Sequence, residues 1–334
     1  MLQKACSALA MKTATRHWVQ ITIGALALAV AAAVIYSERG QLSGTAAALS
    51  TANFGLIVVG FGLEVISDLS YALMTYYLLP TRLGRLTRRW FFGASLAAIA
   101  MNDSIPLGAG FSVAYLYRKL RGRGCSAVEA TAALLAGNLL AIVALLVLLG
   151  FVLVAHTQAT AVLSNVDIAI LFGLLLLAVA AIVRMDRLLV LAIHVGARFR
   201  HIFRLKGQPN ESSILTAKQL RYSPRAIAQS SLGALGNWLF DLATLMLSLV
   251  AVHAHVGLVG VTAAYVLGAL AANLPITPGG LGVVEGSITV ALVAFGGAPS
   301  SMLAAVLLYR VVSYWLWIPI GWGSYFLLGG LREK

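Results

Sequence analysis

The sequence has few charged residues and almost no cysteine. Charged residues make up 10% of its 334 residues, whereas 60% are hydrophobic and the mean hydropathy is +0.91. A soluble domain cannot bury that much apolar surface, so the composition predicts an all-α polytopic integral membrane protein. The two cysteines, Cys6 and Cys125, lie far apart in basic segments that we expect in the reducing cytoplasm. This excludes a disulfide framework.

The sequence also lacks the motifs of common enzymes. It contains no nucleotide-binding loop and no evident metal cluster or Ser-His-Asp arrangement. His253 and His255 have no third ligand close by in the sequence, so they favour an interfacial position over a metal site. We therefore expect no metal, no cofactor and no catalytic residue.

The net charge of +13 could suggest a nucleic-acid partner. However, the Lys and Arg residues form short clusters between apolar runs, which is typical of cytoplasmic loops, and we expect no nucleic acid. The longest such segment, Arg184 to Arg225, carries nine Lys or Arg residues. We expect it in the cytoplasm, with an interfacial amphipathic helix over residues 186–204.

Apolar runs near or above the ~20 residues that a bilayer requires predict six spanning helices. They cover residues 18–36, 48–78, 128–154, 166–183, 229–252 and 300–328. Two further apolar regions, 90–117 and 257–296, are interrupted by Pro and Gly, which predicts broken, re-entrant helical hairpins. Near the chain end, an aromatic belt at the membrane surface is predicted for Trp315, Trp317, Trp322 and Tyr325.

The positions of Lys and Arg also predict how the chain is oriented in the membrane. Clusters at 82–89 and 118–123 flank the first broken region, whereas no Lys or Arg flanks the second closely. The first should therefore enter and leave from the cytoplasm and the second from outside. We expect both chain termini in the cytoplasm. The first span favours an uncleaved helix over a signal peptide, because it is long enough to cross the membrane.

The two broken regions share a PxGxG motif. PLGAG at Pro106–Gly110 and PGGLG at Pro278–Gly282 are 172 residues apart, and the same offset places Asn138 opposite Arg310. Asp68 falls opposite Asp241 at an offset of 173. Chance is the alternative, because such motifs are common in membrane helices. A repeat with opposite orientations is a transporter design whose substrate path lies between the repeats.

This repeat predicts four regions. They are an N-terminal tail and first helix (1–40), a first repeat (41–155), a connecting helix with the basic segment (156–228) and an inverted second repeat (229–334).

Ionisable residues inside predicted spans need partners, since an ionised group at a helix centre costs about 2.5 to 3.5 kcal/mol. We expect an ion pair between Asp241 and Arg310, with Glu285 as the alternative partner of Arg310. Glu64 and Asp68 should also face a polar path. Glu285 has a second interpretation as the cap of a helix start.

The hairpin tips are rich in glycine, which lets a headgroup approach the backbone. The tip residues are Pro106, Gly108, Gly110, Pro278, Gly279, Gly280 and Gly282. Helices that begin after Gly110 and Gly282 would aim backbone N–H groups at the cavity, which favours an anionic group there.

The stretches NLPITPGGLGVVEGSITVALVAFG and AAVLLYRVVSYWLWIPIG resemble the lysylphosphatidylglycerol synthase transmembrane family, also called the flippase-like domain family. It includes the membrane domain of bacterial multiple peptide resistance factors. The family pattern PGGLGxxE, followed about 25 residues later by an intramembrane Arg, is matched by Pro278, Gly279, Gly280, Gly282, Glu285 and Arg310. The first-half element is matched more loosely by SIPLGAGFSVAYLYRKLRGRGCS.

The chain departs from the family at two points. Asn138 stands where relatives often carry Arg or a Glu-Arg pair. The soluble aminoacyl-transfer domain of the resistance factors is not in this sequence, so the resemblance does not imply lysyl-lipid synthesis.

The repeat, the intramembrane charges and the resemblance together predict a lipid translocase of the bacterial plasma membrane. An amphiphile with an anionic headgroup would pass Glu64, Asp68, Arg118, Asp241, Glu285 and Arg310 without covalent chemistry. The alternatives are a lipid-modifying enzyme and an accessory subunit of cell-envelope or glycolipid assembly that depends on the basic segment. The expected partners are a membrane lipid and either a second copy of the chain or an envelope-synthesis protein.

Overall fold

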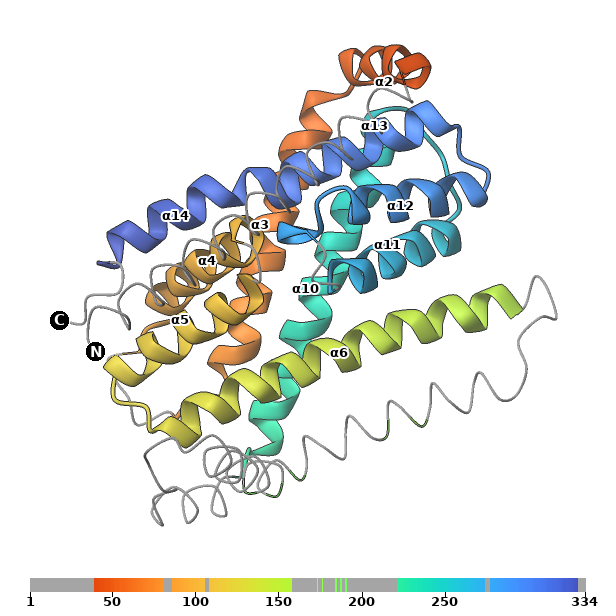
Figure 1. Ribbon diagram of the computed structural model, residues 1–334. Helices are drawn as coiled ribbons and strands as arrows, with labels where there is room; N and C mark the ends of the chain where they lie inside the picture. The colour runs from red at the N-terminus through yellow and green to blue at the C-terminus, as the bar shows by residue number, and fades with distance from the viewer. Residues whose placement is uncertain are drawn as a thin grey trace, which may run out of the picture.

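The computed structural model describes residues 39–80, 86–105, 108–157, 221–273 and 277–329, together with isolated positions between 173 and 190. All regular structure in these ranges is helical (Figure 1). In chain order the elements are α2 (Arg39–Ser50), α3 (Phe54–Tyr76), α4 (Arg88–Ser104), α5 (Gly108–Gly122), α6 (Ala127–Thr157), α10 (Pro224–Ala251), α11 (Leu258–Ala272), the 3₁₀ turn η1 (Pro278–Gly280), α12 (Val283–Ala294), α13 (Pro299–Arg310), the π-helical turn η2 (Val311–Trp315) and α14 (Trp317–Leu327).

Four of the described helices are long and apolar enough to cross a membrane. They are Phe54–Tyr76, Ala127–Ala155, Pro224–Ala251 and the run Pro299–Leu327, which joins α13, η2 and α14. Long apolar helices are thus confirmed at four of the six predicted spans. The predicted spans 18–36 and 166–183 and the amphipathic helix over 186–204 lie outside the described residues, apart from isolated positions.

Each predicted broken region contains two short helices. α4 ends at Ser104 before α5 begins at Gly108, and α11 ends at Ala272 before α12 begins at Val283. The two members of each pair lie side by side, and the open ends of the two pairs point in opposite directions (Figure 1). The turns meet, because η1 contacts α4. The order of long helix, two short helices and long helix therefore occurs twice, while the inverted relation and the re-entrant course stay predictions.

Polar residues mark where several helices begin. Asn53, Thr87 and Ser223 each accept a backbone N–H from the first turn of α3, α4 and α10. At α6, Glu129 accepts the Ser126 N–H while the Ser126 hydroxyl accepts the Glu129 N–H, a complete capping box. Local sequence thus fixes these helix starts before any long-range packing.

α3 and α10 pack closely along their length. The Thr244 hydroxyl of α10 donates to the Gly60 carbonyl of α3 at 3.3 Å. Ser67 Oγ donates to the Asn237 carbonyl at 2.9 Å, and Asn237 Nδ2 donates back to Ser67 Oγ at 3.0 Å. Small residues and interhelical hydrogen bonds hold membrane helices together where lipid removes the hydrophobic drive. Of the broken helices, α4 also contacts α3 and α11 also contacts α10.

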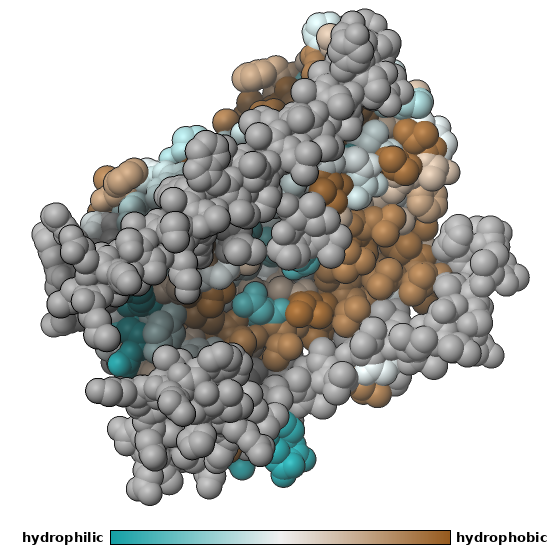
Figure 2. Space-filling view, viewed as in Figure 1, coloured by the Kyte–Doolittle hydropathy of each residue, from teal (hydrophilic) through white to brown (hydrophobic). Residues whose placement is uncertain are grey.

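Large hydrophobic side chains lie on the outside of the molecule. Phe54, Val290 and Phe326 are 75%, 69% and 72% exposed. In Figure 2 the visible surface over α11 and α12 is mostly hydrophobic. An apolar surface of this extent suits contact with lipid chains.

The close packing of α3 and α10 predicts the effect of a methyl group at Gly233. A Cβ there would lie 2.8 Å from the Ser70 carbonyl oxygen and 2.9 Å from the Met74 nitrogen. We expect Gly233→Ala to lower the free energy of unfolding by about 1 to 3 kcal/mol, because the helices must separate. Unfolding in detergent measures the change.

The matched control is Gly62→Ala on α3, where a Cβ meets no atom within 4 Å. It should leave the stability unchanged or raise it, because alanine favours a helix over glycine. Equal stability of the two variants would contradict the close approach of α3 and α10.

Candidate functional site

Arg310 lies inside the last long helix and is almost completely buried, with 9% of its side chain exposed. Its Nε donates to Glu285 Oε1 at 2.7 Å, and its Nη2 donates to the Gly279 carbonyl at 2.9 Å. The guanidinium carbon lies 3.9 Å from the centroid of the Tyr314 ring, a cation–π contact. The described residues thus supply acceptors for two of the five guanidinium N–H groups.

The π-helical turn η2 follows Arg310 directly. The Leu316 N–H donates to the Val311 carbonyl five residues earlier, at 3.1 Å. Single π turns within α-helices are frequent at functional sites. Arg310 and Tyr314 are four residues apart, so both side chains lie on the same face of this helix.

Glu285 performs both roles that the sequence predicts for it. Its Oε2 accepts the Gly282 N–H at 2.7 Å and so caps the start of α12, while its Oε1 pairs with Arg310. Gly282 has no side chain, so only the glutamate half of a capping box is formed. The expected ion pair between Asp241 and Arg310 is wrong, and the alternative partner Glu285 takes its place.

Asp241 instead binds two tyrosines. The Tyr265 hydroxyl donates to Asp241 Oδ2 and the Tyr309 hydroxyl to Oδ1, each at 2.8 Å. Tyr309 and Arg310 are consecutive, so on a helix their side chains point about 100° apart. One faces Asp241 on α10 and the other faces the second turn. Two neutral tyrosine hydroxyls therefore bind the Asp241 carboxylate, which the sequence predicts as the partner of Arg310.

Tyr314 connects the two turns. Its hydroxyl donates to the Asp103 carbonyl at the end of α4, at 2.6 Å. Its ring packs against Gly279, where a Cβ would overlap the ring. Gly279 has φ +57°, a conformation that glycine adopts at little cost. The first turn, the second turn and Arg310 thus meet at one aromatic side chain.

The helix that follows the first turn begins earlier than predicted. α5 starts at Gly108 and not after Gly110, so Gly110 lies in the first helical turn. A Cβ at Gly108 would overlap the carbonyl oxygens of Met101 and Asn102. The end of α4 and the start of α5 therefore touch through their backbones. Pro106 lies outside the described residues.

Glu64 and Asp68 lie one turn apart on α3 and are 4% and 7% exposed. Glu64 Oε2 and Asp68 Oδ2 have no hydrogen-bond partner among the described residues. Asp68 is close enough to Asp241 and Asp103 to interact with their charges. Glu64 and Asp68 are therefore buried beside Asp241, and their place on a polar path stays a prediction. Carboxyl groups outnumber cations among the described residues around Asp241 and Arg310.

Arg118 is not brought to the site. It is exposed and lies ten residues after the start of α5, about 15 Å along the helix axis. Asn138, which the repeat offset aligns with Arg310, donates from its Nδ2 to the Leu134 carbonyl of its own helix at 3.0 Å.

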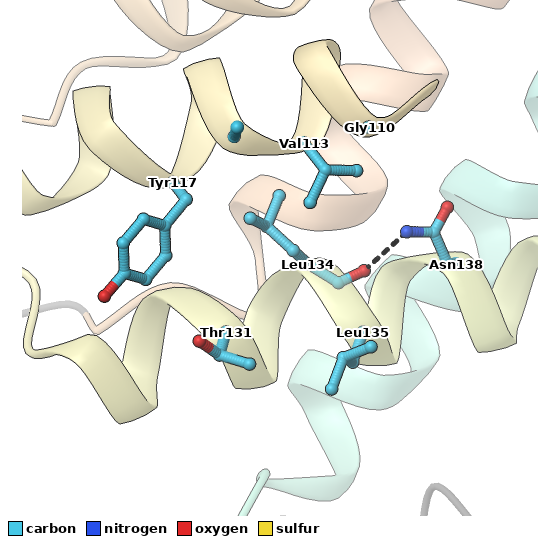
Figure 3. Close-up of a pocket in the computed structure, with 8 residues that line it drawn as sticks. Gly110, Val113, Tyr117, Thr131, Leu134, Leu135 and Asn138 are labelled. Carbon is cyan, nitrogen blue, oxygen red and sulfur yellow. Dashed lines mark hydrogen bonds between the residues drawn. The ribbon is translucent and has the colours of Figure 1, made fainter. Parts of the chain in front are cut away.

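Asn138 lines a pocket of about 340 Å³ between α5 and α6. Gly110 and Asn138 lie at one end of the pocket and Tyr117 and Thr131 at the other (Figure 3). Leu134 and Val113 line the space between them. The pocket is therefore largely apolar and extends along the helices from the first turn.

The sequence analysis missed the tyrosines of the site. Tyr309 and Tyr314 flank Arg310 in YRVVSY, and their spacing on a helix is a usable signal. Tyr265 gives none, because its partner Asp241 is 24 residues away in another helix. The belt prediction is wrong for Trp317, which is buried and stacks on Phe61 of α3 with ring centroids 5.7 Å apart.

These features define a class of protein. It is a multi-pass helical membrane protein in which the turns of two broken helix pairs meet at a buried Arg–Glu pair, beside further buried carboxyl groups.

The family model of the lysylphosphatidylglycerol synthase TM region matches residues 18–321, and the chain belongs to this family. The family that the PGGLGxxE element and its arginine predict is thereby confirmed. The comparison with curated proteins finds no match.

The Arg310–Glu285 pair predicts a non-additive effect of mutations. Arg310→Ala leaves Glu285 without its cation and should lower the free energy of unfolding by about 3 to 5 kcal/mol. Glu285→Gln keeps an acceptor for the Gly282 N–H but loses the charge. The double variant should lose less stability than the two single variants combined, because no uncompensated charge remains.

Unfolding in detergent or nanodiscs completes this double-mutant cycle. Arg88→Ala removes an exposed arginine and serves as the control, with a change within about 0.5 kcal/mol. Strict additivity of the two single losses would contradict the ion pair.

The contact between Gly279 and Tyr314 predicts a difference in stability between two glycine variants. Gly279→Ala adds a methyl group against the ring at positive φ and should cost more than about 1 kcal/mol. Gly286→Ala adds the same methyl group on α12 where no atom lies within 4 Å. Unfolding temperatures compare the two, and a Gly279→Ala variant as stable as Gly286→Ala would disprove the contact.

Proposed function

We propose that this protein moves a lipid with an anionic headgroup between the two leaflets of the membrane. Membership of the family supports a role connected with membrane lipids. The observation that carries the proposal is Arg310, a buried cation at the point where both turns meet, for which the described residues supply acceptors to two of five guanidinium N–H groups.

The chemistry of Arg310 suits a phosphate. A guanidinium group presents its donors in a planar fork that matches phosphate oxygens with two parallel hydrogen bonds. The Tyr314 ring, which contacts this group, fixes its plane. A lipid phosphate binds the remaining N–H groups first and then takes the place of the Glu285 carboxylate.

The groups around Arg310 provide a polar route for the headgroup. Glu64, Asp68 and Asp241 follow one another on the facing sides of α3 and α10, and the tyrosines that bind Asp241 add hydroxyl groups. A headgroup that crosses here exchanges hydrogen bonds instead of entering hydrocarbon, where each unsatisfied polar group costs several kcal/mol.

The lipid tails need no polar route. They stay in the membrane, and the apolar pocket between α5 and α6 offers space for a chain next to the first turn. Two broken helix pairs with opposite openings suit access to one site from either side of the membrane.

This mechanism forms and breaks no covalent bond. The protein operates in the bacterial plasma membrane with both termini in the cytoplasm.

The test is lipid movement in reconstituted vesicles. Phosphatidylcholine vesicles carry a trace of phosphatidylglycerol labelled on its acyl chain, and a quencher confined to the outside reports the rate of exchange. Arg310→Ala and Glu285→Ala should each slow exchange by at least about tenfold, since a hydrogen bond to a charged group contributes about 1.5 to 3 kcal/mol.

Arg88→Ala should exchange phosphatidylglycerol at the wild-type rate, and circular dichroism confirms that each variant is helical. Acyl-labelled phosphatidylcholine should move more slowly than phosphatidylglycerol. Wild-type rates in both charge variants would overturn the proposed site, and equal rates for the two lipids would overturn the preference for an anionic headgroup.

A further inference from the structure

The hydrogen bonds from Thr244 to the Gly60 carbonyl and from Ser67 to the Asn237 carbonyl place Glu64 opposite Asp241 at the interface of α3 and α10. Glu64 is 4% exposed, and its Oε2 has no hydrogen-bond partner among the described residues. Ionised carboxylates only accept hydrogen bonds, so two carboxyl groups bond to each other only through a proton. Two buried carboxyl groups that face each other here can therefore bond only when one of them is protonated.

The surroundings place this proton between Glu64 and Asp241. The hydroxyls of Tyr265 on α11 and Tyr309 on α13 donate to the two oxygens of Asp241, which favours Asp241 as the acceptor. Glu64 is then the donor, and Thr244 of α10 lies beside it.

Other titratable groups face this pair from the neighbouring helices. Asp68 is one turn further along α3 and interacts with Asp241, while Asp103 at the end of α4 interacts with Asp68. Arg310 is the cation close enough to affect Asp241 among the described residues, and it is already paired with Glu285. The pair thus sits in a region with excess negative charge, and a bound proton reduces that charge.

A metal ion fits this place less well than a proton. Hard cations such as Ca²⁺ take six to eight oxygen ligands. No group of three or more His, Cys, Asp or Glu side chains in the described ranges is arranged to hold a metal ion.

We propose that Glu64 and Asp241 form a proton-binding site that holds one shared proton, and that a lipid phosphate entering at Arg310 raises the affinity of this site for its proton. The lipid site and the proton site are linked by charge and by helix α13. A phosphate adds negative charge beside Asp241, which favours proton binding, and Tyr309, which contacts Asp241, precedes Arg310 on α13. The proton site stands on the structure alone, whereas its coupling to lipid rests on the proposed function.

Infrared spectroscopy of the full-length protein in nanodiscs tests the proton site. The carbonyl stretch of a protonated carboxyl group should be present in the wild type and absent in Glu64→Gln. Glu129→Gln is the matched control, because Glu129 is a buried glutamate that caps α6, a role glutamine can fill, and this variant should keep the band. Where Glu64→Gln does not fold, Asp241→Asn should also lose the band, since the new side-chain amide can donate to an ionised Glu64.

A band that survives both Glu64→Gln and Asp241→Asn overturns the shared proton. Loss of the band in Asp68→Asn with retention in Glu64→Gln assigns the proton to Asp68 and overturns it equally.

The coupling is tested with the phosphatidylglycerol exchange assay at several pH values. The wild-type rate should vary with pH, and the rate of Glu64→Gln should not. A pH-independent wild-type rate overturns the coupling while the infrared result still stands. Vesicles in which the wild type moves no lipid contradict the proposed function, and the infrared band then decides the proton site separately.

Discussion

The structure depends on one constraint, namely that an arginine inside a membrane-crossing helix must be paired. An ionised arginine at a helix centre costs about 2.5 to 3.5 kcal/mol on insertion, so its neighbours must offset that cost. Arg310 meets a carboxylate, a backbone carbonyl and an aromatic face. Glu285 and Gly279, which supply the first two, belong to the second broken pair. The break in that pair is what places them within reach of the last long helix.

The turns of the broken helices leave backbone groups that an unbroken helix would satisfy within itself. Inside lipid every backbone group needs a partner, so a turn is tolerated only where protein groups satisfy it. Glu285 caps the Gly282 N–H, Arg310 satisfies the Gly279 carbonyl, and Tyr314 satisfies the Asp103 carbonyl of the other pair. The same contacts that hold the turns in place therefore gather a cation, carboxyl groups and hydroxyls around one point. The stability of the turns and the proposed headgroup site therefore depend on the same contacts.

The sequence predicts the parts that depend on local chemistry. Hydropathy locates the four long described helices, and Pro and Gly locate both breaks, because these signals act within a few residues. It also finds Arg310, Glu285 and Asp241 as polar residues inside apolar runs. It chooses the wrong partner for Arg310, because Tyr309 and Arg310 differ by about 100° around one helix and only the packing decides which of them faces Asp241. Trp317 is placed wrongly in the surface belt for the same reason, since its burial against Phe61 depends on long-range packing.

Arg310 is close enough to affect the charge of Asp241, so the proposed lipid site and the proposed proton site belong to one electrostatic arrangement. The central claim is that Arg310 receives a lipid phosphate, and a structure of the protein in nanodiscs that contain phosphatidylglycerol tests it most directly. The account predicts phosphate density within about 2.7 to 2.9 Å of the Arg310 guanidinium nitrogens, between the two turns. Lipid density that is confined to the outer surface, with Arg310 bound only to Glu285 and Gly279, would contradict it.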